Sequence, residues 1–365
     1  MMARTILLNP GPVTLTDRVR QAMTLADWCH REPEFARLTK SINARLAGVY
    51  EAAADEYAAV LLTGSGTSAV EAMLATFAPV DGKTLVVANG VYGERMAAML
   101  TAMGRPLEIT EAAWDAPIDL DAVEQRLSAQ SSITHLVAVH HETTTGRLNE
   151  IGALGALCLK YNCALLLDSV SSFGAEEIKF REWNLHAMAG TANKCLHGVP
   201  GLSFVLARRE LYLDDESSAG TVYLDLRRYF KTQHNDGYSP FTLSVQAAFA
   251  LDAALDELRE EGGWLKRRQR YREVANSVRE TLLGLGVSTF IPESDCSSVM
   301  SSYRLPPGVS YAGLHDWLKR QGFVIYAGQG HLSDSMFRIA NMGAIRDSDV
   351  ERLKQALASF FDGAQ

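Results

Sequence analysis

Two residues with reactive side chains, Asp168 and Lys194, each follow a short apolar segment. Asp168 ends the run CALLLD (163–168), which has the length and composition of a buried strand, and Lys194 lies in MAGTANKCLHGVPG (188–201), where glycines and a proline predict a tight loop. A lysine amine can form a Schiff base with an aldehyde, and a carboxylate can keep a pyridine nitrogen protonated so that the ring draws in electrons. The pair therefore predicts a site for pyridoxal phosphate. The structural alternative is a helix-capping aspartate and a solvated lysine.

The segment TGSGTS (63–68) has the form of an anion-binding turn. It follows an apolar strand predicted over 58–62, and a helical pattern starts directly after it. The unpaired N–H groups of a first helical turn, together with the helix dipole, favour a bound phosphate. Ser65 and Thr67 add hydroxyl donors, whereas the alternative is an ordinary strand-to-helix turn with hydroxyl caps. No lysine follows the second glycine, so the segment is not a Walker loop.

Two further polar groups follow predicted strands. Tyr92 comes after the strand expected over 84–88, and an aromatic ring there can stack on a flat cofactor, although a core or surface tyrosine is the alternative. The run HETTTG (141–146) follows the strand over 134–140, and its hydroxyls can bond a phenolic oxygen or a substrate. Because ligands of parallel α/β sheets bind outside the carboxyl ends of the strands, we expect these groups to share one site with Asp168.

The spacing of apolar residues predicts an α/β protein. Strands and helices alternate from 58 to 206, which predicts a mostly parallel sheet with helices on both faces. Residues 216–240 are polar and predict an irregular excursion over the surface or into a subunit contact, whereas 245–285 is a long helical region. From 297 the pattern changes to that of a small α+β domain. We therefore expect an N-terminal segment (1–15), a large cofactor-binding domain (16–260) and a small C-terminal domain (261–365).

Arg338 lies on a strand predicted over 336–340, between Phe337 and Ile339. Side chains alternate between the two faces of a strand, so Arg338 faces away from both apolar neighbours. It either faces solvent or reaches into the cleft between the domains, where its planar fork can bind an anion through two N–H groups.

Composition and charge narrow the class of protein. The 365-residue chain is 47% hydrophobic and 21% charged, as in globular proteins, and its formal charge of −8 argues against a nucleic-acid partner. The five cysteines are odd in number and lack CxxC spacing, so we expect reduced thiols and a cytoplasmic protein. The histidines show no metal-ligand spacing, no window is long and apolar enough to span a membrane, and the first residues lack the pattern of a signal peptide.

Several motifs occur in an order and spacing that resemble one family along nearly the whole chain. They are LLNPGPV, DWCHREPEF, LLTGSGTSAVEA, ANGVYGERM, HHETTTGRLN, DSVSSFG, ANKCLHGVPG and FRIANMG. The family is that of the class V aminotransferases, pyridoxal phosphate enzymes of fold type I, and HETTTG, DSVSSFG and ANKCLHGVPG are the most specific matches. The resemblance implies a large and a small domain, and a homodimer.

The resemblance also implies a role for each matching residue. Lys194 would carry the cofactor as a Schiff base, and Asp168 would pair with the pyridine nitrogen. The remaining contacts would be made by Ser65, Gly66 and Thr67 to the phosphate, with help from Thr242 of the partner subunit, by Tyr92 to the ring, by Thr145 to the phenolic oxygen, and by Arg338 to the phosphonate or carboxylate of the substrate. Related aminotransferases often have tryptophan or phenylalanine at the position of Tyr92.

Within the family, the motifs most resemble the group that moves the amino group of 2-aminoethylphosphonate to pyruvate, in phosphonate catabolism. The implied products are 2-phosphonoacetaldehyde and L-alanine. An aminotransferase of the same family that uses alanine or serine with glyoxylate is the alternative, because the pocket residues that select the substrate cannot be located in the sequence. A cofactor-binding transcription regulator would need an added DNA-binding domain, and a nucleotide-dependent oxidoreductase would need GxGxxG.

Overall fold

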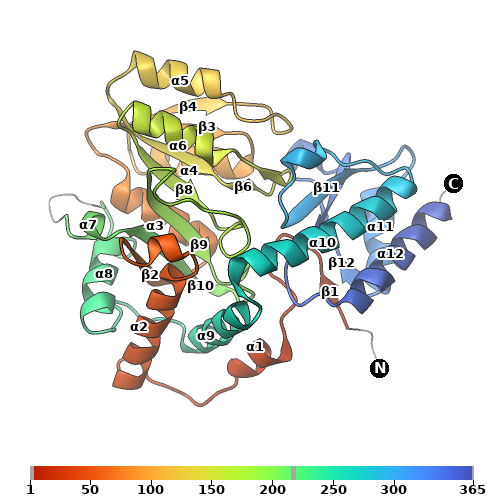
Figure 1. Ribbon diagram of the computed structural model, residues 1–365, viewed down its shortest axis with the longest axis horizontal. Coiled ribbons are helices and arrows are strands. Elements are labelled where there is room, and N and C mark those ends of the chain that lie inside the picture. The colour runs from red at the N-terminus through yellow and green to blue at the C-terminus, as the bar shows by residue number, and fades with distance from the viewer. Residues whose placement is uncertain (1–3, 215–218, 364–365) are drawn as a thin grey trace.

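The computed structural model describes residues 4–214 and 219–363, and its largest element is a seven-stranded sheet (Figure 1). The strands lie in the order β2–β10–β9–β8–β5–β3–β4, and neighbours are parallel except that β10 runs antiparallel to both β2 and β9. Their bounds are β2 Tyr57–Gly64, β3 Lys83–Ala88, β4 Leu107–Glu111, β5 Ile133–Val139, β8 Ala164–Asp168, β9 Leu185–Thr191 and β10 Gly201–Arg208. The predicted mostly parallel α/β sheet is confirmed.

The two faces of this sheet belong to separate hydrophobic cores. On one face Leu61 and Leu167 pack with residues of α2, α5, α6 and α9, whereas on the other Val60 and Leu166 pack with residues of α3, α4, α7 and α8. The alternation follows the two-residue period of a strand. The helices span α2 Pro33–Ala47, α3 Gly66–Phe77, α4 Val91–Ala102, α5 Leu120–Ala129, α6 Ile151–Lys160, α7 Arg209–Tyr212, α8 Leu226–Asn235 and α9 Val245–Glu260.

A smaller group of elements has a core of its own. A three-stranded antiparallel sheet, in the order β11–β14–β13, shares this core with two helices and with the parallel pair β1–β12. The long helix α10 (Gly263–Gly284) runs from the large sheet into this group in Figure 1, and its residues Val278 and Leu282 lie in the smaller core. The bounds are β1 Ile6–Leu7, β11 Met300–Arg304, α11 Tyr311–Arg320, β12 Phe323–Val324, β13 Tyr326–Ala327, β14 Met336–Ala340 and α12 Asp347–Asp362.

One expectation about secondary structure is wrong. The polar composition of residues 216–240 predicts irregular structure, but α8 occupies the middle of this range, and residues 216–218 lie outside the part of the chain described. The helix buries Leu226, Tyr229 and Gln233, which are spaced three and four residues apart on one face. The polar residues between them conceal this period in the sequence. The short helix that the sequence predicts over 16–25 is present as α1 (Asp17–Ala22), and the structure adds a hairpin of β6 (His141–Glu142) and β7 (Arg147–Leu148).

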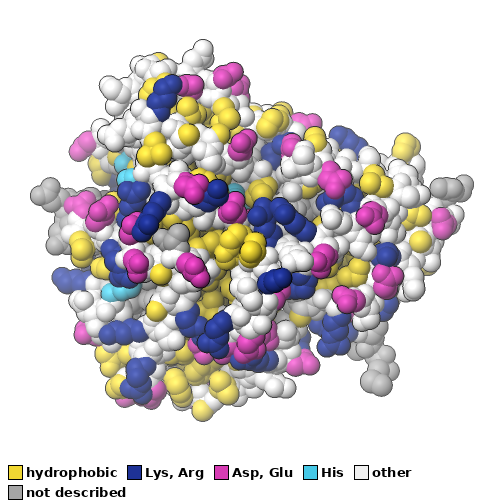
Figure 2. Space-filling model, viewed as in Figure 1, with side chains coloured by type: hydrophobic (Ala, Val, Ile, Leu, Met, Phe, Trp, Pro, Cys, Tyr) yellow, Lys and Arg dark blue, Asp and Glu magenta, His cyan; other side chains and the backbone are white. Residues whose placement is uncertain are grey.

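Charges of both signs are mixed on the surface. On the face seen in Figure 2, basic and acidic side chains are interspersed, and neither sign covers a continuous area. Within residues 4–214 and 219–363, no helix combines the length and apolar composition that a membrane crossing requires. The same residues contain no group of three or more His, Cys, Asp or Glu side chains arranged to hold a metal ion.

Candidate active site

Asp168 is the last residue of β8, the central strand of the large sheet. Its side chain is buried, and Oδ1 accepts a hydrogen bond from Val170 N at 2.9 Å, so one oxygen caps the turn that follows the strand. Burial raises the pKa of Asp168 to about 6, because a low dielectric disfavours the charged form, and the Val170 amide and the nearby charges of Lys194 and Arg95 oppose that rise. The pKa of this carboxyl group therefore lies close to neutrality, and a cation placed beside it would lower the pKa.

Lys194 lies on the loop between β9 and β10, next to Asp168 in space. Burial lowers the pKa of Lys194 to about 8, while Cys195 and Asp168 raise it and the positive charges of Arg338 and Arg95 lower it further. Lys194 Nζ donates a hydrogen bond to Pro10 O. A lysine with this pKa has a substantial neutral fraction near pH 8, which nucleophilic and general-base chemistry both require.

The segment Ser65–Gly66–Thr67 begins helix α3 at the carboxyl end of β2. Ser65 is the N-cap residue, but its side chain makes no capping bond, and the amides of Gly66 and Thr67 have no hydrogen-bond acceptor among the described residues. A Cβ on Gly66 would lie 2.6 Å from Val170 Cγ1, so only glycine fits against the turn that follows Asp168. Free amides, an exposed hydroxyl pair and the positive end of the helix together form an anion-binding cradle.

Tyr92 is in the first turn of α4, at the carboxyl end of β3. The guanidinium of Arg95 lies 4.8 Å from the centre of the Tyr92 ring, and Arg95 Nη1 donates to Thr67 Oγ1 at 3.4 Å. A small cavity between α3 and α4 is lined by Gly66, Thr67, Tyr92, Arg95 and Asp168, among other residues. The structure thus brings the Tyr92 ring, the anion-binding cradle and the buried Asp168 carboxylate together at the carboxyl ends of the strands.

The run His141–Gly146 is buried and contains polar atoms that lack partners. His141 Nε2, Glu142 Oε2, Thr143 Oγ1, Thr145 Oγ1 and Ser169 Oγ are buried and make no hydrogen bond within the described residues. Such groups are rare in folded proteins, and in a site they mark places where a ligand supplies the missing partner. Thr145 Oγ1 can donate to a phenolic oxygen. Together with Lys194, Asp168 and the cradle at Ser65–Thr67, these atoms match the aldehyde, ring nitrogen, phenol and phosphate of pyridoxal phosphate.

Arg338 does not face solvent, because it is only 4% exposed. Its strand neighbours Phe337 and Ile339 lie in the smaller core, as the two-residue period predicts. Arg338 Nη1 donates to Thr143 O at 2.8 Å and to Gln329 Oε1 at 3.3 Å, and Nε donates to Ala327 O at 2.8 Å. These bonds hold the guanidinium across from the threonine run, while Nη2 makes no hydrogen bond within the described part of the chain.

Thr242 lies just before α9 and is exposed. Its carbonyl oxygen accepts a hydrogen bond from Thr63 Oγ1 at 3.1 Å, and its hydroxyl lies 3.4 Å from His30 Nε2. Thr242 is thus close to the anion-binding cradle of its own chain. Its contact with the cofactor of a partner subunit stays a prediction.

Sequence reasoning misses several side chains of this site. His141 and Glu142 belong to the HETTTG run, of which only the threonine hydroxyls are expected from the sequence to bind a ligand. Burial lowers the pKa of His141 to about 4, so the ring is neutral, and burial raises the pKa of Glu142 to about 7. The position of a strand end is the signal that could have found both, because the whole run follows β5. Nothing in the sequence indicates that Pro10 contacts Lys194.

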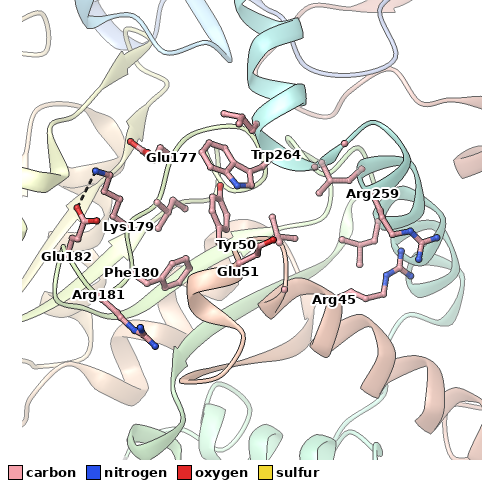
Figure 3. Close-up of a pocket in the computed structure, with 18 residues that line it drawn as sticks. Arg45, Tyr50, Glu51, Glu177, Lys179, Phe180, Arg181, Glu182, Arg259 and Trp264 are labelled. Carbon is pink, nitrogen blue, oxygen red and sulfur yellow. Dashed lines mark ion pairs between the residues drawn. The ribbon is translucent and has the colours of Figure 1, made fainter.

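A much larger cavity than the one beside Asp168 lies elsewhere. It has a volume of about 970 Å³ and opens between α2, the α9–α10 junction and residues 177–182 (Figure 3). Tyr50, Phe180 and Trp264 contribute apolar walls, and the cations at its rim are paired with carboxylates, as Lys179 is with Glu182 at 3.2 Å. None of the strand-end residues described above lines it, and paired cations leave little free charge for an anionic ligand. Size alone does not identify the active site of this protein.

The sequence and the fold were compared with known proteins. The family model described as Aminotransferase class-V matches residues 24–351. The 2-aminoethylphosphonate--pyruvate transaminase of Bacillus mycoides (strain KBAB4) is 36% identical over 355 residues, which are 97% of this chain and 97% of that protein. The bifunctional phosphonoacetaldehyde hydrolase/aminoethylphosphonate transaminase of Clostridioides difficile (strain 630) is 36% identical over 363 residues, and the chain, matched over 98% of its length, spans 56% of that relative.

Two solved structures extend the comparison to the fold. Pyridoxamine-pyruvate aminotransferase from Mesorhizobium loti superimposes with a TM-score of 0.87 at 26% identity, covering 99% of this chain and 92% of that one. Alanine--glyoxylate aminotransferase from Nostoc sp. superimposes with a TM-score of 0.90 at 24% identity, covering 99% and 96%. The arrangement of both sheets is therefore shared with aminotransferases over nearly the entire chain.

Proposed function

The chain belongs to the class V aminotransferases, and from this we propose that it moves the amino group of 2-aminoethylphosphonate to pyruvate with pyridoxal phosphate as cofactor. The products would be 2-phosphonoacetaldehyde and L-alanine. The observation that carries the proposal is the likeness to the Bacillus mycoides transaminase over 97% of both chains. The buried Arg338 opposite the threonine run adds a place for the acid group of each substrate.

The residues of the site would hold the cofactor from every side. Pyridoxal phosphate supplies an aldehyde carbon that takes up an amine and a protonated ring that draws electrons from the reacting carbon. We propose that Lys194 binds that carbon, that Asp168 keeps the ring nitrogen protonated and that Tyr92 stacks on the ring. The phosphate and the phenolic oxygen would be bound by Ser65, Gly66 and Thr67, with Thr242 of the partner subunit, and by Thr145.

Lys194 would also move the proton during the reaction. After a substrate amine has taken the place of Lys194, the freed Nζ can accept the proton from the substrate carbon that bears the amine. The same Nζ can donate that proton again in the next step. Its pKa of about 8 leaves enough neutral amine for the first step. Asp168, with a pKa near 6, is ionised above that pH and offers the negative charge that a protonated ring nitrogen needs. Because the two substrates use one site in turn, ping-pong kinetics are expected.

Three broader features belong to the same proposal. The division into an N-terminal segment (1–15), a large domain (16–260) and a small domain (261–365) is supported by the separate core of the C-terminal elements, although Ile6 and Leu8 share that core. Residues 1–3, 215–218 and 364–365 of these segments lie outside the described structure. A homodimer is supported by exposed aromatic side chains, among them Trp28 and Tyr223. Tyr223 lies near the anion-binding cradle, because its hydroxyl donates to Thr63 O at 3.0 Å. A cytoplasmic location is supported by the five cysteines, each of which is a free thiol.

A donor and acceptor screen tests the substrate pair. Purified protein loaded with pyridoxal phosphate should convert 2-aminoethylphosphonate and pyruvate into 2-phosphonoacetaldehyde and L-alanine. Ethylamine, which lacks an acid group, and 3-aminopropanoate, which carries a carboxylate in place of the phosphonate, are the matched control donors. The proposal fails if alanine or serine with glyoxylate reacts readily while 2-aminoethylphosphonate does not. In that case the same fold would serve an alanine/serine–glyoxylate-type aminotransferase.

A further inference from the structure

The turn Asn9–Pro12 lies directly over Lys194. Pro10 O accepts a hydrogen bond from Lys194 Nζ. At Gly11, φ is +110°, and a Cβ there would lie 2.7 Å from Lys194 Cδ and 2.8 Å from Cε. The turn is closed by Asn9, whose Nδ2 donates to Pro12 O at 3.0 Å and whose carbonyl accepts from Gly11 N at 2.8 Å. The backbone of this turn therefore forms one wall of the lysine's pocket, and a larger residue at position 11 would be strained at this φ and would require the end of the Lys194 side chain to shift.

Both ends of this turn are attached to the smaller group of elements and not to the large sheet. Before the turn, β1 pairs in parallel with β12, Leu8 N donates to Val324 O at 2.8 Å, and Leu8 O accepts from Ala340 N at 2.7 Å. After the turn, Thr14 O accepts from Ala344 N at 2.8 Å. Lys194, in contrast, belongs to the loop between β9 and β10. The bond from Lys194 to Pro10 therefore joins the two parts of the molecule at the reactive amine.

We propose that the Pro10 carbonyl is a positioning group that holds the free amine of Lys194 whenever this amine is not bound to the cofactor. The inference rests on the proposed role of Lys194. When a substrate amine displaces the lysine, the released Nζ needs a hydrogen-bond acceptor in a buried pocket, and Pro10 O provides one. With one N–H donated to that carbonyl, the nitrogen has a fixed direction from which to accept a proton from the substrate carbon.

The same bond affects the charge of the lysine. A carbonyl oxygen stabilises a protonated amine more than a neutral one, so under this proposal the bond to Pro10 O should raise the lysine pKa against the effect of burial. The other groups that act on this amine are Asp168 and Cys195, which favour the charged form, and Arg95 and Arg338, which disfavour it. A change confined to the turn leaves these four in place, so it isolates the contribution of Pro10.

Gly11→Ala is the direct test, because the new Cβ must displace Lys194 or the turn. Gly286→Ala is the matched control, since Gly286 also has a positive φ, +78°, but a Cβ at that position would have no atom within 4 Å. The first measurement uses cofactor-free protein and follows, by visible absorbance, the rate at which Lys194 captures added pyridoxal phosphate as a function of pH. In Gly11→Ala the midpoint of this profile should fall by about one pH unit, because the charged amine has lost its acceptor.

The second measurement uses loaded enzyme and the best amine donor of the wild type, with hydrogen or deuterium on the carbon bearing the amine. In Gly11→Ala, kcat should fall about tenfold or more with little change in KM, and the isotope effect should increase as proton transfer becomes limiting. Asn9→Ala, which loosens the turn without a clash, should show both changes to a smaller degree. Thermal unfolding of each variant identifies loss of the fold.

Unchanged pH midpoints and isotope effects in folded Gly11→Ala and Asn9→Ala would overturn the proposal, as would equal effects in Gly286→Ala. These outcomes are separate from failure of the proposed function. If wild-type protein captured no pyridoxal phosphate through Lys194, the role of the lysine itself would be wrong, and this would be evident before any variant is compared.

Discussion

Replacing Thr145 by valine separates a ligand-binding role of this residue from a structural one. Thr145 is 0% exposed, and its Oγ1 has no hydrogen-bond partner within the described structure. A buried hydroxyl without a partner destabilises a protein by about 1–3 kcal/mol relative to an apolar group of the same shape. Valine has nearly the shape of threonine, so Thr145→Val should raise the free energy of unfolding of the cofactor-free protein by about 1–2 kcal/mol.

Although Thr145→Val should stabilise the cofactor-free protein, it should weaken the binding of the cofactor. If Thr145 Oγ1 donates to the phenolic oxygen of pyridoxal phosphate, its loss removes a hydrogen bond to a charged group, worth about 1.5–3 kcal/mol, and lowers affinity about tenfold or more. Urea denaturation of cofactor-free protein and equilibrium titration with pyridoxal phosphate measure the two effects. Thr84→Val is the matched control, because Thr84 is equally buried and its hydroxyl also lacks a hydrogen-bond partner within the described structure. Thr84 lies near the beginning of β3, whereas the proposed site lies at the carboxyl ends of the strands. The reasoning is refuted if both variants change cofactor affinity alike, or if Thr145→Val destabilises the cofactor-free protein.

The remaining predictions concern the other contacts of the site. Lys194→Ala should abolish both turnover and the visible absorbance of the lysine–cofactor linkage, and a borohydride-reducible linkage in this variant would contradict the role of Lys194. In wild type, the rate of cofactor capture should rise with pH through about 8, because only the neutral amine reacts. Asp168→Ala should retain some cofactor but lose most turnover, and near-normal kcat would leave Asp168 only a capping role. Gly66→Ala should weaken cofactor affinity, since its Cβ would lie 2.6 Å from Val170, and Val170→Ala in the same protein should restore much of it. Arg338→Lys should weaken both 2-aminoethylphosphonate and pyruvate, by about 2–5 kcal/mol in binding, while the cofactor absorbance is unchanged; retained affinity for both would place the anion site elsewhere.

The arrangement of strands could be predicted well because the large sheet follows local rules. Most of its strands are apolar runs of five to eight residues that end in a polar or glycine-rich turn, and the helices between them have clear periods. The position of Asp168 at a strand end, and of the cradle before α3, follows from that pattern alone. Helix α8 could not be predicted in this way because one of its three buried residues, Gln233, is polar, so the apolar spacing in the sequence does not show the helical period.

Contacts between distant segments were not predictable in the same way. The sequence places Arg338 either in solvent or in a cleft, and the choice depends on the packing of β14 against the loop after β5, which brings Thr143 O to its guanidinium. Likewise, the turn at Pro10 meets Lys194 only because β1 joins β12. Neither strand is long enough to indicate its partner, since two residues carry almost no pairing information.

The pairing of Ile6 with Phe323 has a consequence for how the chain acquires its structure. Ile6 and Phe323 lie far apart in the sequence, so this contact has a very high sequence separation, and we expect it to form late in folding. During synthesis the large sheet can assemble while the first residues remain unpaired. The wall over Lys194 is then completed only when the last strands have been made. An incomplete chain would thus lack the turn that lies over Lys194.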